Sequence, residues 1–327
     1  MTKLIAVLMS LLFATPLLYG GVVPGTNCTE FPSDNVWNTP INDLPVNPYS
    51  AAWEASLPGQ YMTLGFGPAG GKHYGFPFQA ITSSIPLVKM TFSDPSESDP
   101  GGYPFNASTP IEPYDGGDKH ALMIGPDPST AAGTCYDYEL YDAKWSSTKP
   151  KAANGEIWNL SSNNLIWNSA YPTADIDDAG LPLFAGLVRY DEVAAGLINH
   201  ALRFEGTQAY SENTLWPGTY IPTYLDTPNP NVIWMASRWR LKSTYDISSF
   251  STQAQVILTA LKTYGMFMSD IGDDWQLDGT LDTRWTTSLM NELVTIPSSE
   301  FEAVDESCLE VSATSGQVAP SASSCSY

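Results

Sequence analysis

The sequence predicts a β-rich α+β fold, with a sandwich-like antiparallel sheet core and two principal helices. Several short segments alternate apolar and polar residues between loops rich in Gly and Pro, as in Leu87–Phe92 and Cys135–Tyr141, and this is the pattern of half-buried strands. Only two stretches, within 180–205 and 252–264, space their apolar residues as a helix does. No linker divides the chain, so a single globular domain is expected over residues 23–306.

The first helical stretch organises the prediction, because it gathers several chemically useful side chains. We expect one amphipathic helix through residues 191–204, capped by Asp191 and interrupted in its middle by Gly196. The polar stripe of this helix contains Glu192, Asn199 and Arg203, and His200 lies at its edge. His200 is therefore either a satisfied, partly buried histidine or part of a cleft lined by this stripe.

The second helix is the clearest in the chain. A capping box at Thr252–Gln255 precedes an apolar stripe that stops at Gly265. The stripe consists of Ala254, Ile257, Leu258, Leu261 and Tyr264. It leads into a turn rich in carboxylates, which includes Asp270, Asp273 and Asp274 and ends at Trp275.

Two further polar groups lie where loops enter strands. Ala121–Gly125 and Cys135–Tyr141 are expected to pair as a hairpin, and Asp118 and His120 stand directly before the first of these strands. The long loop 94–117 that precedes them is of a length that is often functional. His73 lies on a glycine-rich loop before the strand Phe76–Ile81.

The N-terminus and the cysteines predict a secreted, extracellular protein. Lys3 followed by the apolar run Leu4–Leu18 indicates a signal peptide over residues 1–22. Four cysteines without zinc-like spacing fit an oxidising compartment and allow three pairings, of which we favour Cys28–Cys135 and Cys308–Cys325. The second pair would tie down a Ser-rich tail over 307–327. Three sequons, at Asn27, Asn106 and Asn159, predict a glycoprotein in a eukaryotic host.

The charge limits the classes of partner. A net charge of −21 argues against nucleic acids, anionic membranes and highly acidic polymers. Ten Trp and seventeen Tyr provide rings that stack on sugar faces. Polysaccharides or oligosaccharides without strong negative charge are therefore the expected partners, and we expect a monomer.

Several long motifs resemble a family of secreted, mostly bacterial proteins of unassigned function. They are Asn35–Ile41, Gly117–Ile124 (GDKHALMI), Glu139–Ala143 (ELYDA), Gly180–Phe204, Arg240–Ser248 and Tyr264–Trp275 (YGMFMSDIGDDW). The resemblance covers nearly all of the chain after its N-terminal run and implies a single-domain secreted protein. It implies no activity. The extra cysteines and the Ser-rich tail depart from the family pattern.

The leading hypothesis is a glycoside hydrolase that uses paired carboxylates and no cofactor. The predicted catalytic residues are Asp118, His120, Asp191, Glu192 and His200, and the predicted substrate-binding residues are Arg203, Arg240, Asp270 and Trp275. We expect Asp118, His120, Glu192, His200 and Arg203 to share one cleft.

Two alternatives remain open. His73, His120 and His200 are candidates for a site that binds a divalent metal ion, although no two of them have the spacing of ligands on one helix. A non-catalytic carbohydrate-binding protein would use the aromatic residues alone. A serine hydrolase is disfavoured because the chain lacks a Gly-x-Ser-x-Gly elbow.

Overall fold

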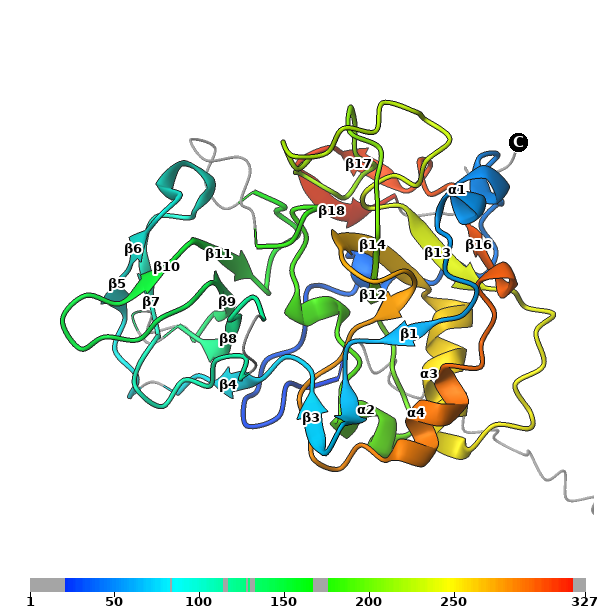
Figure 1. Cartoon of the computed structure of the whole chain (residues 1–327). Helices are drawn as coiled ribbons and strands as arrows, with labels where there is room; N and C mark the ends of the chain where they lie inside the picture. The colour runs from blue at the N-terminus through cyan, green and yellow to red at the C-terminus, as the bar shows by residue number, and fades with distance from the viewer. Residues whose placement is uncertain are drawn as a thin grey trace, which may run out of the picture.

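The structure is a computed structural model of the 327-residue chain and describes residues 21–82, 84–113, 117–127, 129, 133–166 and 176–319. It confirms the strand-rich α+β fold. A six-stranded sheet and a four-stranded sheet lie side by side, and the described helices α3 and α4 stand next to the larger sheet (Figure 1). The described helices are α1 (Ser50–Ser56), α2 (Tyr190–Ala195), α3 (Thr252–Thr263) and α4 (Thr287–Leu293), with short 3-10 turns at Val36–Asn38, Pro95–Glu97, Phe184–Gly186 and Ser298–Glu300.

The larger sheet is mixed rather than wholly antiparallel. Its strand order is β1-β15-β12-β14-β13-β16, and its two central strands β12 and β14 run parallel. The bounds are β1 (Thr63–Leu64), β15 (Gln276–Leu277), β12 (Leu202–Gly206), β14 (Met266–Ile271), β13 (Arg238–Leu241) and β16 (Phe301–Ala303). The segment between β12 and β14 contains α3, which supplies the crossover that a parallel pair needs. The buried rings of Phe204, Trp239 and Trp275 pack together at the centre of this larger sheet.

The smaller sheet confirms the predicted hairpin. Its order is β11-β9-β8-β4, and β8 pairs antiparallel with β9 over its whole length. The bounds are β4 (Phe78–Ala80), β8 (Ala121–Pro126), β9 (Cys135–Tyr141) and β11 (Asn154–Asn159). Tyr103, Phe105 and Tyr138 belong to a second hydrophobic cluster on this sheet. Each sheet therefore has apolar packing of its own.

Four small strand pairs complete the described strands. They are β2 (Gly67–Ala69) with β3 (Lys72–Tyr74), β5 (Val88–Lys89) with β7 (Gly102–Tyr103), β6 (Thr91–Phe92) with β10 (Lys151–Ala152), and β17 (Glu310–Ser312) with β18 (Ser315–Val318). The strand predicted over Leu87–Phe92 is thus divided at Met90. Its two halves pair with different neighbours, which alternation alone does not reveal.

The prediction of one long helix over residues 191–204 is wrong. Helix α2 ends at Ala195, because Gly196 adopts a left-handed conformation with φ of 84° and closes the helix as its C-cap. The N-cap is Arg189 rather than Asp191, which lies in the first turn. Of the apolar residues after Gly196, Leu202 and Phe204 belong to the buried strand β12, whereas Leu197, Ile198 and Ala201 precede it in irregular structure. A continuous apolar run in a central strand has the same composition as a helix face.

The second helix is confirmed almost to the residue. The hydroxyl of Ser251, rather than of Thr252, accepts the capping hydrogen bond from the Ala254 N–H. Gly265 follows in a left-handed conformation with φ of 68°. The chain then enters β14 directly, so this helix end sets the position of Asp270 near the end of that strand.

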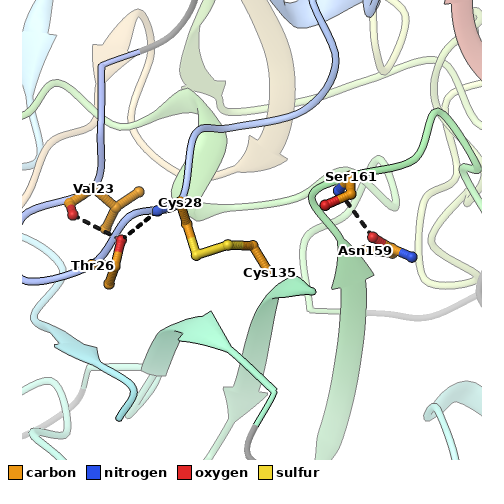
Figure 2. The surroundings of a disulfide bond; sticks show 6 residues. All are labelled: Val23, Thr26, Cys28, Cys135, Asn159 and Ser161. Carbon is orange, nitrogen blue, oxygen red and sulfur yellow. Dashed lines mark hydrogen bonds between the residues drawn. A yellow bond between two sulfur atoms is a disulfide. The ribbon is translucent and has the colours of Figure 1, made fainter. Parts of the chain in front are cut away.

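The predicted disulfide Cys28–Cys135 is present, with a Cα–Cα distance of 5.7 Å. It joins the N-terminal segment to the start of β9 (Figure 2). Cys308 is also disulfide-bonded. Cys325, most of the predicted signal peptide and the end of the tail lie outside the described residues. In the described part of the chain, every helix is too short or too polar to cross a membrane.

Candidate active-site cleft

A cleft of about 250 Å³ opens between the two sheets. It is lined by Asp118, His120, Tyr141, Ile176, Asp178, Tyr224, Asp270 and Ile271. Tyr141 ends β9 of the smaller sheet, and Ile271 ends β14 of the larger one. Asp118 and His120 immediately precede β8, as expected. The loops that carry Ile176, Asp178 and Tyr224 provide the remaining wall.

Arg203 lies beneath this cleft, with no exposed surface. The guanidinium is 2.9 Å from the Asp177 carboxylate, 3.0 Å from Asp278 and 3.4 Å from Asp270. Its Nε donates to the hydroxyl of Ser269 at 2.9 Å. Because Arg203 is on β12 and Ser269 is on the adjacent β14, the register of the two parallel strands fixes the position of the cation.

Carboxylates outnumber cations around Arg203, and the pKa values of several of them are raised. Burial raises the pKa of Asp177 to about 7, against the opposing attraction of Arg203. Burial and the neighbouring charge of Asp178 raise the pKa of Asp270 well above its usual range. Burial also raises the pKa values of Asp278 and Glu205. The Arg203 cluster, which we define as Arg203 with Asp177, Asp178, Glu205, Asp270 and Asp278, therefore combines one buried cation with carboxyl groups of raised pKa on Asp177, Glu205, Asp270 and Asp278.

Asp178 and Asp270 form a close pair at the cleft wall. The backbone N–H of Ile271 donates to Asp178 Oδ2 at 3.2 Å and to Asp270 Oδ1 at 2.8 Å. The two acceptor oxygens share this nitrogen and therefore lie within about 6 Å of each other. Tyr224 also donates its hydroxyl to Asp178 Oδ2. Asp270 keeps 22% of its side chain exposed, so the pair is accessible from the cleft.

His120 is oriented by a carboxylate behind it. Its Nδ1 lies 3.2 Å from Glu112 Oε2, and the ring lies 5.2 Å from the ring of Phe76 and 5.5 Å from that of Tyr141. Burial raises the pKa of Glu112, but the hydrogen bond and charge of His120 outweigh it and hold that pKa below its usual range. His120 Nε2 is buried and makes no hydrogen bond to the described residues. A residue of the cleft wall thus keeps one ring nitrogen for a ligand.

A second buried cluster holds the other predicted catalytic residues. Arg189 has no exposed surface and forms ion pairs with Glu30 and Glu192, the latter at 2.7 Å, while Asp191 lies 3.7 Å away. His200 Nε2 lies 3.0 Å from Glu192 Oε2. We call these five residues the Arg189 cluster. Burial raises the pKa of Glu192, but Arg189 and His200 outweigh it and hold the pKa below its usual range.

The expectation of one common cleft is therefore corrected. The structure brings Asp118, His120, Asp270 and the underlying Arg203 together. Asp191 and Glu192 contact Arg189 instead, His200 contacts Glu192, and none of the three lines the described wall of the cleft. One reason is the end of α2 at Gly196, because Arg203 then lies on β12 and does not share a helix face with Glu192.

The three histidines do not form the metal site considered as an alternative. Each histidine has a different carboxylate nearby. His120 pairs with Glu112 and His200 with Glu192, and the charge of His73 lowers the pKa of Asp282. Within the described ranges, no group of three His, Cys, Asp or Glu side chains is arranged to hold a metal ion.

Two of the predicted substrate-binding residues have structural roles. Trp275 is fully buried and stacks on Phe204 and Phe301, so it has no surface to offer a ligand. Arg240 pairs with Glu302 at 2.8 Å. Its Nη1 also donates to the backbone carbonyls of Ile41, Asn42 and Leu44, and it thereby fastens the N-terminal arm to β13.

Sequence reasoning missed several residues of the site. Asp178, Tyr224 and Tyr141 line the cleft, whereas Asp177 and Glu112 contact Arg203 and His120. The adjacent pair Asp177–Asp178, just before Gly180, was the available signal, because two carboxylates beside a strongly apolar run are unusual. Glu112 carried no such signal, since its partner His120 is eight residues away across a loop.

Comparison of the chain with protein-family models, with curated proteins and with solved structures finds no match. The function is therefore argued from the cleft alone.

Proposed function

We propose that the protein is a secreted glycoside hydrolase that acts on neutral glycans, with Asp178 and Asp270 as its paired carboxylates. The proposal rests above all on one observation: both carboxylates accept from the Ile271 N–H, at the wall of an open cleft. Glycosidases need two such groups, one to protonate the leaving oxygen and one to attack the sugar or activate water.

Asp270 is assigned as the acid and Asp178 as the nucleophile. Because the pKa of Asp270 is raised well above its usual range, this group carries a proton at the pH at which it must donate one. Asp178 accepts hydrogen bonds from Tyr224 and from the Ile271 N–H, which orient its carboxylate. After Asp178 bonds to the anomeric carbon, Asp270 would accept a proton from the incoming water and so restore its acid form.

The spacing of the pair favours retention of anomeric configuration. Retaining glycosidases hold their carboxyl groups about 5–5.5 Å apart, whereas inverting enzymes need about 6.5–9.5 Å to admit a water molecule. Oxygens within about 6 Å of each other fit the shorter distance.

The cleft also supports a small, uncharged sugar unit as the ligand. Its volume of about 250 Å³ lies just below the range of pockets that hold drug-sized ligands. The carboxylates of Asp118 and Asp178 at the wall would repel an anionic sugar. The ring of Tyr224 is 64% exposed at the edge and offers a face for stacking.

The experiment is hydrolysis of a panel of neutral and acidic glycans by the wild type and by Asp178→Asn and Asp270→Asn. We expect cleavage of neutral substrates and a loss of about 10²–10⁴-fold in kcat for each variant. Asp273→Asn is the matched control, because Asp273 is exposed three residues after Asp270. Mass spectrometry with a slow 2-fluoro glycoside should find the covalent adduct on Asp178.

Two results would contradict the proposal. Binding of neutral glycans without any cleavage would show that the protein is a carbohydrate-binding protein and not a hydrolase. Cleavage that survives in both Asn variants would show that other residues catalyse it.

A further inference from the structure

The first described residue, Gly21, lies against the Arg189 cluster. Its backbone N–H donates to the Glu192 carboxylate, and its carbonyl oxygen accepts from Arg189 Nη2 at 3.4 Å. A side chain at this position would meet the cluster directly, because a Cβ on Gly21 would lie 2.7 Å from Glu192 Oε1. Two residues later, Val23 is fully buried, and its N–H donates to the carbonyl of Cys28 at 2.9 Å. The chain start is thus anchored on both sides of Val22.

The charges of this cluster are unequal while Gly21 is an internal residue. His200 Nδ1 lies 2.8 Å from the carbonyl oxygen of Ala201, so this nitrogen must donate. Its Nε2 lies 3.0 Å from Glu192 Oε2. Even with His200 counted as a cation beside Arg189, the basic groups are fewer than the three carboxylates of Glu30, Glu192 and Asp191.

We propose that the signal peptide is removed between Gly20 and Gly21, and that the new α-ammonium group of Gly21 becomes the third cation of the Arg189 cluster. A signal peptidase would hydrolyse the Gly20–Gly21 amide with one water molecule. Gly20 leaves as a carboxylate, and the nitrogen of Gly21 becomes an amine that takes up a proton near neutral pH. That nitrogen already lies at the Glu192 carboxylate, so no rearrangement of the cluster is required.

This assignment moves the start of the mature chain two residues before the boundary expected from the sequence. It also gives the cluster a function that is separate from the cleft: maturation of the N-terminus stabilises the fold. A glycine suits this position, because any side chain would displace Glu192 or Arg189.

The first measurement is the intact mass of the secreted protein after removal of any glycans. A chain that begins at Gly21 is expected. A chain that begins at any other residue overturns the proposal.

The second measurement separates the effect of the α-ammonium charge from that of the N–H hydrogen bond to Glu192. Two forms are made with a removable tag, one that begins at Gly21 and one that keeps Gly20. Both retain an N–H at the same place, but only the first has the α-ammonium. The Gly21 form should melt about 1–2 °C higher at pH 6.5, equivalent to about 1 kcal/mol for a chain of about 300 residues. Nα-acetylation of the Gly21 form should abolish this gain, and equal Tm values for all three forms contradict the proposal.

The pH dependence gives a third test. The α-amino pKa is about 8 in an unfolded chain and is raised in the folded protein by Glu192, Glu30 and Asp191. A raised folded pKa gives stability that is complete below about pH 8 and disappears as the pH rises through the folded value. The difference in Tm between the Gly21 and Gly20 forms should therefore vanish above about pH 10, and in Glu192→Gln it should be absent at every pH. A difference that persists at high pH or in that variant would overturn the proposal.

Discussion

Two fully buried arginines, Arg203 and Arg189, organise two clusters of carboxylates whose central members differ in pKa. Around Arg203, the pKa values of Asp177, Asp270 and Asp278 are raised. Around Arg189, the pKa of the buried Glu192 is lowered, whereas burial raises the pKa of Asp191. Burial acts in the same direction in both places, so it does not explain the difference.

The ratio of cations to carboxylates explains the difference. In the Arg203 cluster a single guanidinium interacts with four carboxyl groups, and burial raises the pKa values of all four. In the Arg189 cluster Arg189 and His200 both contact Glu192, and they lower its pKa. An excess of carboxyl groups at an open cleft provides acids for catalysis, whereas a closed cluster provides stability.

Replacement of Arg203 tests the first cluster and should have the largest effect. Arg203→Met leaves Asp177 and Asp278 buried without their cation, and the free energy of unfolding at pH 7 should fall by about 3–5 kcal/mol. Urea denaturation measures it. The control is Arg284→Met, because Arg284 is 57% exposed and its pair with Asp282 should contribute less than about 1 kcal/mol. Equal losses in the two variants would show that Arg203 is not the centre of a buried cluster.

Glu192→Gln tests the second cluster and should cost less. The amide keeps the shape of the side chain but leaves Arg189 and His200 facing each other without the carboxylate between them. We expect a loss of about 2–3 kcal/mol in the free energy of unfolding at pH 7. The loss should persist at pH 5, since the pKa of Glu192 in the wild type lies below its usual range. A loss confined to alkaline pH would contradict this account.

The pH dependence of stability gives the smallest effect for each titrating group. Asp99, Asp177 and Glu306 each have a pKa raised to about 7 in the folded protein. Between about pH 5 and 7 the folded state binds more protons than the unfolded state, so the free energy of unfolding should fall as pH rises, by on the order of 2 kcal/mol for each of these groups. Asp177→Asn should reduce this slope. Asp246→Asn should leave this slope unchanged. The pKa of the exposed Asp246 is lowered, so this group titrates below pH 5. Stability that rises between pH 5 and 7 would overturn the raised pKa values.

The sequence by itself determined the elements whose signals come from residues close together in the chain. The capping residues and Gly265 fix α3, and an apolar run followed by an alternating segment predicts the hairpin of β8 and β9. The pairing of Cys28 with Cys135 was favoured among three possibilities and is present. Within the site, Asp118 and His120 were placed at the mouth of a strand because the loop before β8 is polar and the strand is apolar.

Only the tertiary structure decided which charged residues meet. Glycine occurs both inside helices and at left-handed helix ends, so only the folded chain decides that α2 ends at Gly196 and that Arg203 lies on a strand. Asp177 is distant in the chain from Asp270 and Asp278, and the folded structure brings all three to one guanidinium on β12, next to β14. Their raised pKa values follow from this assembly, because desolvation and mutual repulsion exist only after the chain has folded.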